Sequence, residues 1–190
     1  MSKKAKKILI ILVAIAVFAI VILYVYQKYY LPIKQKTEPI SQAQADEYYK
    51  LANEALGKGD LTTAKENFKQ ALRVGNNELY LEKYALISYQ LNQFDQSIDS
   101  YTKLISIEND NASYWNSIGN VYRDSGKGEE AIKAYQKAIE IDKKYVVVYS
   151  NLANLYLLRN EKDKAQETIK EGLKNNPKDK NLLNIRENIH

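Results

Sequence analysis

The sequence predicts an all-α protein in which four similar helix pairs follow one long apolar helix. Three observations support this fold class. Large and small residues alternate at helical spacing in the segment 115–142, the same order of residues returns every 33 or 34 positions, and an uncharged run of 19 residues occupies 8–26. Residues at helical spacing share one face of a helix, so the repeated pattern predicts packing between helices.

The apolar run at 8–26 has the length expected of a membrane-spanning helix. At 1.5 Å per residue it would reach about 28 Å, close to the ~30 Å hydrocarbon core of a bilayer. Four lysines precede it, and four tyrosines between 24 and 30 lie where an aromatic belt would form. We therefore expect residues 1–7 to be a basic tail and residues 8–26 to be a transmembrane signal-anchor helix.

A cleaved signal peptide is the alternative interpretation of this run. Its apolar region would be shorter, and a small-x-small cleavage site should follow it, whereas "QKYYLP" follows here. The lysine bias favours a cytoplasmic N-terminus, with the body of this single-pass membrane protein on the extracytoplasmic side. Residues 27–41 contain Pro32 and Pro39, so we expect an extended linker there.

Composition removes several classes of function. The chain has no cysteine, and its only histidine is His190. Thiol chemistry, metal sites built on cysteine or histidine, and histidine-based catalysis are therefore not expected. Residues 1–40 carry seven lysines and one glutamate, whereas the rest of the chain is nearly neutral. A neutral body argues against nucleic-acid binding. We expect no cofactor, no metal and no nucleic-acid partner.

The repeats are the clearest feature of the sequence. One copy places residues in the order Trp115, Gly119, Tyr122, Ala131, Tyr135 and Ala138. A shift of 34 residues aligns this copy with Tyr149, Ala153, Tyr156, Ala165 and Gly172. Two earlier copies start at Tyr48 and Leu81, and Pro177 closes the last one. Because one helix pair cannot bury its own apolar face, such copies must stack on one another.

The pattern resembles the tetratricopeptide repeat, a 34-residue helix-turn-helix unit. Residues 115–122 read "WNSIGNVY", close to the first-helix signature of that family, and "EEAIKAYQKAIEID" resembles its second helix. The resemblance implies a right-handed α-solenoid over 42–179, with repeats at about 45–77, 78–111, 112–145 and 146–179. Gly59 and Gly126 are expected in the turns between paired helices. Residues 180–190 are expected to form a capping helix.

The resemblance also implies a protein-protein interaction scaffold. In this family the first helix of each repeat lines a concave groove that holds peptides. Carried over by register, the expected peptide-binding residues are Tyr49, Asn53, Tyr89, Asn116, Asn120, Arg123 and Asn154. Asparagine amides can form hydrogen bonds with the backbone of an extended peptide whatever its side chains are. Tyrosines offer amphipathic contact area.

The function expected from the sequence is that of a membrane-tethered scaffold that binds protein or peptide partners. It would serve as an adaptor or assembly factor of a membrane-associated complex of the secretion, pilus-assembly or cytochrome-maturation type. The alternative is a structural module that forms homo-oligomers through its repeats. An enzyme is not expected, because the "GKG" triplets at 57–59 and 126–128 fall in turns and lack the other residues of a phosphate-binding loop.

Overall fold

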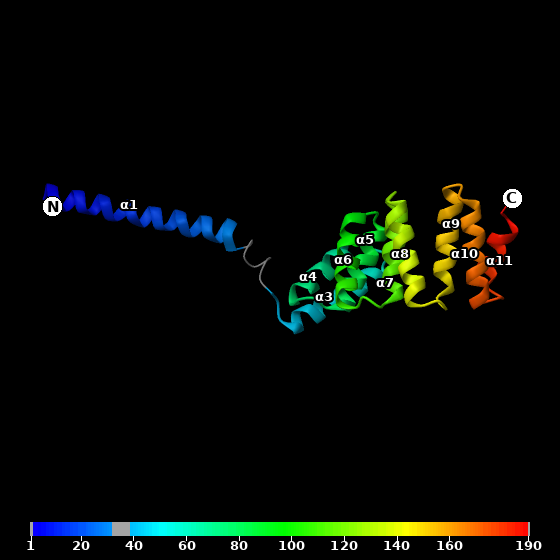
Figure 1. Ribbon diagram of the computed structural model, residues 1–190. Coiled ribbons are helices and arrows are strands. Elements are labelled where there is room, and N and C mark those ends of the chain that lie inside the picture. The colour runs from blue at the N-terminus through cyan, green and yellow to red at the C-terminus, as the bar shows by residue number, and fades with distance from the viewer. Residues whose placement is uncertain (1, 32–38, 190) are drawn as a thin grey trace. The chain divides into compact units, whose positions relative to one another are not determined.

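The computed structural model describes residues 2–31 and 39–189, apart from the side chains at 3, 4, 7–11 and 14. The chain divides into two compact units, Met1–Ser41 and Gln42–His190, which are described separately. In the first unit, α1 spans Lys3–Val25, and the Ser2 Oγ accepts a hydrogen bond from the Ala5 N–H at 3.2 Å (Figure 1). A turn of π-helix, η1, continues it over Tyr26–Tyr30, where the sequence had predicted the start of a linker. Residues 32–38 of that predicted linker lie outside the described residues.

The prediction of a transmembrane helix over 8–26 is wrong. Across residues 2–31 and 39–189, no helix is both long enough and apolar enough to cross a bilayer. The side chains at 8–11 and 14 lie outside the described residues. The single-pass membrane location and the extracytoplasmic body depended on that helix, so both are corrected with it.

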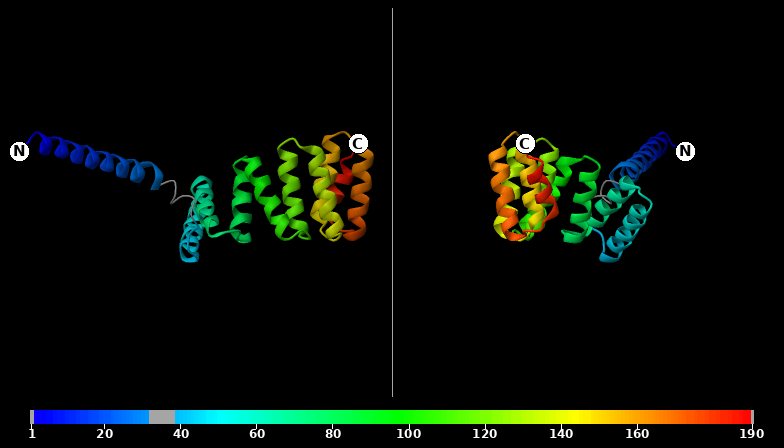
Figure 2. Two further views of the ribbon diagram at one scale, coloured as in Figure 1. Left: turned by 60° about the vertical axis from the view of Figure 1, so that its left-hand side comes forward. Right: turned by 90° about the vertical axis from the view of Figure 1, so that its right-hand side faces the viewer.

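The second unit is all-helical, and its helices form successive antiparallel pairs (Figures 1 and 2). The first helices of the pairs are α3 (Gln42–Gly57), α5 (Glu78–Gln90), α7 (Ala112–Asp124) and α9 (Val146–Leu158). The second helices are α4 (Leu61–Ala71), α6 (Phe94–Ile107), α8 (Gly128–Ile141) and α10 (Lys162–Asn175). A 3₁₀ turn, η2 (Leu72–Val74), follows α4, and α11 (Lys180–Glu187) follows α10. Each helix packs against the next, and α7 also contacts α9. The predicted all-helical stack of repeats is confirmed.

One turn geometry joins the two helices of every pair. The residues that leave the first helix with a positive φ are Gly59 (75°), Asn92 (56°), Gly126 (80°) and Asn160 (60°). In each turn the N–H of the following residue bonds back five positions, as Gln93 does to the Ser88 carbonyl at 2.8 Å. This is the Schellman motif, which satisfies carbonyls at a helix end. Glycine or asparagine is needed there because other side chains rarely adopt a left-handed backbone.

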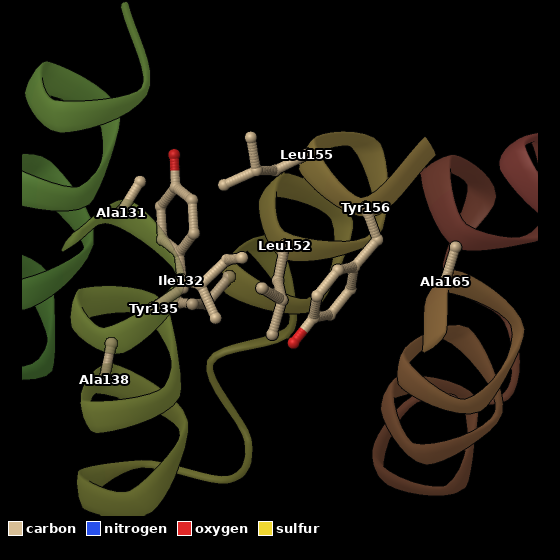
Figure 3. Close-up of a cluster of buried hydrophobic side chains, with 9 residues drawn as sticks. Ala131, Ile132, Tyr135, Ala138, Leu152, Leu155, Tyr156 and Ala165 are labelled. Atoms are coloured by element: carbon tan, nitrogen blue, oxygen red, sulfur yellow. The ribbon is translucent and has the colours of Figure 1, made fainter. Parts of the chain in front are cut away.

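Buried aromatic rings fill the space between pairs, and small residues make room for them. Tyr135 is fully buried in a cluster between α8 and α9 that includes Leu152 and Tyr156 (Figure 3). A Cβ atom built on Gly119 would lie 2.6 Å from the Tyr135 Cε1, closer than any real carbon contact. Gly119 is therefore required for α7 and α8 to approach around this ring.

The buried Tyr101 on α6 should make the stability of the stack depend on pH. Burial raises the pKa of its hydroxyl to about 12, from an ordinary value of 10.0. As the pH rises, the unfolded chain releases this proton first. The contribution of Tyr101 to the free energy of unfolding is thus complete below about pH 10, and it is lost as the pH rises towards about 12. At about 1.36 kcal/mol per pH unit, the loss over that window is ~2–3 kcal/mol.

Urea unfolding of the native protein and of Tyr101→Phe at several pH values between about 9 and 12 would measure this effect. The native protein should lose more stability than the variant across the window. Tyr135, whose pKa is also raised by burial, is present in both proteins and cancels in the comparison. Parallel losses in the two proteins would contradict the assignment to Tyr101.

Candidate functional site

The site predicted from the sequence lies on the first helices of the pairs. Tyr49 and Asn53 are on α3, Tyr89 is on α5, and Asn154 is on α9. The remaining three predicted residues, Asn116, Asn120 and Arg123, are on α7. The structure shows that the side chains of α7 are joined by hydrogen bonds to both neighbouring first helices.

A polar network centred on α7 links two pairs. The Tyr89 hydroxyl of α5 donates a hydrogen bond to the Asp124 carboxylate. Arg123 donates to the same carboxylate through Nε at 2.6 Å and Nη2 at 3.1 Å, and its Nη1 lies 3.4 Å from the Asn120 Oδ1. The Tyr135 hydroxyl also donates to the Asn120 Oδ1, at 2.8 Å. These bonds fix the positions of both the Arg123 and the Asn120 side chains.

The electrostatics of the network favour the charged Asp124–Arg123 pair. Hydrogen bonds from Arg123 hold the pKa of Asp124 below its ordinary value, and the bond to Asp124 raises the pKa of Arg123. Burial is the first cause of the raised pKa of Tyr89, and its bond to Asp124 adds to the effect. Tyr89 is therefore a neutral donor at physiological pH. The charge of Arg123 is compensated by Asp124 within the protein. Arg123 would therefore attract an acidic ligand less strongly than an unpaired arginine would.

Asn116 takes part in packing between repeats. It is 6% exposed. Its Oδ1 accepts a hydrogen bond from the Asn151 Nδ2 of α9 at 2.9 Å, and its Nδ2 lies 3.4 Å from the Tyr145 hydroxyl. Both ends of this amide are thus used inside the protein, which joins α7 to α9.

The two predicted residues of α3 form a separate group. The Tyr49 ring contacts Phe68 and Tyr80, with ring centroids 5.7 Å and 5.2 Å apart. The Asn53 side chain is exposed, and its Nδ2 donates to the Tyr49 carbonyl at 2.8 Å. The structure therefore places Tyr49 largely in aromatic packing and leaves the Asn53 Oδ1 open to solvent.

Asn154 on α9 is the most available amide of the predicted set. Its side chain is exposed, and among the residues that the structure describes it makes no hydrogen bond. On α5, Leu86 is 41% exposed and lies one helical turn before Tyr89. Together these side chains offer apolar and amide contacts on the first helices that flank α7.

Sequence reasoning missed Asp124, Tyr145 and Asn151, which hold the predicted residues in place. Asp124 follows Arg123 directly, which is a signal for a local ion pair. Asn151 stands 35 positions after Asn116, one residue out of the repeat register, so alignment of the repeats does not bring the two together. Contact between them depends on how α7 and α9 pack.

Comparison with known families identifies the chain. One family model, described as "TPR repeat", matches residues 85–122 and 119–158, and a second, described as "Tetratricopeptide repeat", matches 45–74 and 146–179. These matches together cover more than half of the chain, so the protein belongs to the tetratricopeptide repeat family. Proteins of this family are generally scaffolds without enzymatic activity. No curated protein gives a significant match to the sequence.

Several solved structures share the fold. MamA is 21% identical with a TM-score of 0.64, over 70% of this chain and 79% of that one. YrrB, described as a TPR protein with an unusual peptide-binding site, is 19% identical with a TM-score of 0.67, over 75% and 74%. A tetratricopeptide repeat protein from Parabacteroides merdae is 20% identical with a TM-score of 0.69, over 76% and 58%. At these identities the likeness concerns the fold.

Proposed function

We propose that the protein binds an extended segment of a partner protein along the first helices α5, α7 and α9, as a scaffold in a multi-protein complex. The observation that carries the proposal is the fixed amide of Asn120. Its Oδ1 accepts bonds from Tyr135 and Arg123, which orients the Nδ2 group of a half-buried side chain whose Nδ2 has no partner among the described residues. A pre-oriented donor binds a peptide carbonyl at a low entropic cost.

The neighbouring side chains complete the proposed contact surface. Asn154 is exposed on α9, and Leu86 is partly exposed on α5, so amide and apolar groups flank Asn120. The Tyr89–Asp124–Arg123 network holds the side chains of this surface in position. In the proposal, its charged groups do not contact the bound segment. Asn116 is left out because its amide is used between α7 and α9. YrrB, with its described peptide-binding site, supports peptide binding as a use of this fold.

The proposed role is that of an adaptor or assembly factor. The complexes considered from the sequence, of the secretion, pilus-assembly or cytochrome-maturation kind, are the first candidates for its partners. Site-specific photo-crosslinking tests the proposal. A photoreactive amino acid placed at Asn154 or Leu86 of the full chain, in cells that produce the protein, should capture the same partner segment. The same probe at Lys133, an exposed position on the second helix α8, should not.

The captured segment then allows a quantitative prediction. Asn120→Asp keeps the acceptor used by Tyr135 and Arg123 and removes the Nδ2 donor. Combined with Asn154→Ala, it should weaken binding of the synthetic segment at least about tenfold, since loss of a buried bonding partner costs roughly 1–3 kcal/mol. Isothermal titration calorimetry would measure the affinity, and circular dichroism would verify unchanged helicity. Lys133→Ala should bind as tightly as the native protein; full affinity in the double variant would place the binding surface elsewhere.

A further inference from the structure

The final helix α11 occupies the place of the first helix of another repeat. Residue 186 stands 34 positions after Leu152. α11 packs against α10 and α9, in the same way that α9 packs against α8 and α7. Within 39–189, no second helix follows α11. Among the residues that the structure describes, α11 is therefore a first helix without a paired second helix.

A groove opens beside α11 on the surface where that second helix would lie. Its volume is about 480 Å³. Its lining residues are Gln166, Ile169, Lys170, Leu173 and Lys174 of α10 and Arg186 of α11. Leu173 is the partly exposed apolar residue of the groove, above the buried Ile169, and the three cationic side chains stand around it. The groove thus combines an apolar strip with positive charge.

The equivalent surface inside the stack shows what such a groove accommodates. Subtracting 34 from Lys170, Leu173 and Arg186 gives Gln136, Ile139 and Leu152. These three residues share a pocket with Lys164, Glu167, Thr168 and Glu171 of α10. Ala165 of α10 packs into the cluster that contains Leu152 and Tyr156 (Figure 3). At the inner surface, the second helix of the next repeat thus packs beside these residues and forms one wall of the pocket.

The end groove differs from the inner one in charge. Lys170, Lys174 and Arg186 stand where the inner surface has Gln136, Glu140 and Leu152. None of the ion pairs between described residues involves these three cations. Glu167 and Glu171 border the two lysines on the adjoining surface of α10, and the groove itself has no acidic lining residue.

We propose that this groove binds an amphipathic helix of a partner protein that carries apolar residues on one face and Asp or Glu beside them. The helix would pair with α11 as α10 pairs with α9, so that its apolar face covers Leu173. Its carboxylates would meet Lys170, Lys174 and Arg186. This surface lies on α10 and α11, apart from the proposed peptide surface on α5, α7 and α9, and does not depend on it.

A second helix of this same chain supplies the probe. A fluorescent synthetic peptide with the sequence of residues 128–142, in which Lys133→Glu and Lys137→Glu are introduced, gives an acidic amphipathic helix. A neutral version has glutamine at every acidic position. Fluorescence anisotropy with the full-length chain should show binding of the acidic peptide, at least about tenfold weaker binding of the neutral one, and weakening at high salt.

Protein variants locate the binding. Lys170→Glu, Lys174→Glu and Arg186→Glu combined should weaken binding of the acidic peptide at least about tenfold and create affinity for a matching lysine-rich peptide. A matched control with Lys69→Glu, Lys103→Glu and Lys133→Glu makes the same charge change at exposed sites on α4, α6 and α8. Equal weakening by the two triple variants would overturn the proposal. So would a dimer, seen by sedimentation velocity, that blocks the peptide and dissociates in the groove variant, because a second copy would then be the occupant.

Discussion

Replacing Tyr135 with alanine is expected to lower the free energy of unfolding by about 3–5 kcal/mol, the range for loss of a buried aromatic ring. Tyr135 is fully buried between α8 and α9. Its ring lies against Gly119, which has no side chain with which to refill the space. The cavity would therefore persist, and two repeats would lose contacts at once. Urea unfolding followed by circular dichroism would measure the loss.

The matched control is Tyr135→Phe, which keeps the ring and removes only the hydroxyl. That hydroxyl donates to the Asn120 Oδ1 at 2.8 Å, and this acceptor keeps its contact with Arg123 in the variant. A single hydrogen bond contributes about 0.5–1.5 kcal/mol. Similar losses in the alanine and phenylalanine variants would show that the bond, and not the ring, stabilises this part of the stack.

Replacing Leu182 with alanine is expected to cost about 2–5 kcal/mol, as for other buried leucines. Leu182 is fully buried in a cluster with Tyr149, Ala153 and Ile169. A Cβ atom on Gly172 would lie 2.6 Å from its Cδ1, so α10 and α11 approach closely at this side chain. The same unfolding measurement applies. Hydrogen exchange should also show that α10 and α11 lose protection first, because each repeat is stabilised by its neighbours.

Leu183→Ala is the control for this prediction. Leu183 is adjacent on α11 but only partly buried, so its loss should be clearly smaller than that of Leu182. The comparison separates packing of α11 onto the stack from any effect on the helix itself. If both variants lose the same amount, Leu182 does not anchor α11 in the way that its burial indicates.

Much of the fold was predictable from the sequence because the repeats constrain it strongly. The positions of Gly59 and Gly126 indicated two turns, and the structure shows the same turn at Asn92 and Asn160. Alignment of the repeats would have placed Asn92 and Asn160 at the same turn position as the two glycines, and asparagine is the other residue that tolerates a left-handed backbone. The apolar run at 8–26 predicted a transmembrane helix, and this was wrong, because no helix among the described residues is both long enough and apolar enough to cross a bilayer.

The candidate site was less predictable. The register placed the expected residues on the first helices, but whether an amide faces solvent depends on bonds between repeats. Asn116 and Asn154 belong to the same predicted row. One is buried against Asn151 and Tyr145, and the other is exposed. The role of Arg123 likewise depends on Asp124, whose carboxylate compensates its charge. Binding by the predicted residues stays a prediction until the crosslinking is done.

The hydrogen bonds between first helices also have a mechanical consequence. Tyr89 with Asp124 connects α5 to α7, and Asn151 with Asn116 connects α7 to α9. In a stack where each repeat touches only its neighbours, a small rotation at one junction adds to the rotations of all the others. A ligand that strains either bond would therefore change the rotation at that junction. Relative to α3, the displacement would be largest at α11, at the other end of the stack. Bending stiffness, measured by pulling on single molecules, should fall when Asn151 is replaced by alanine.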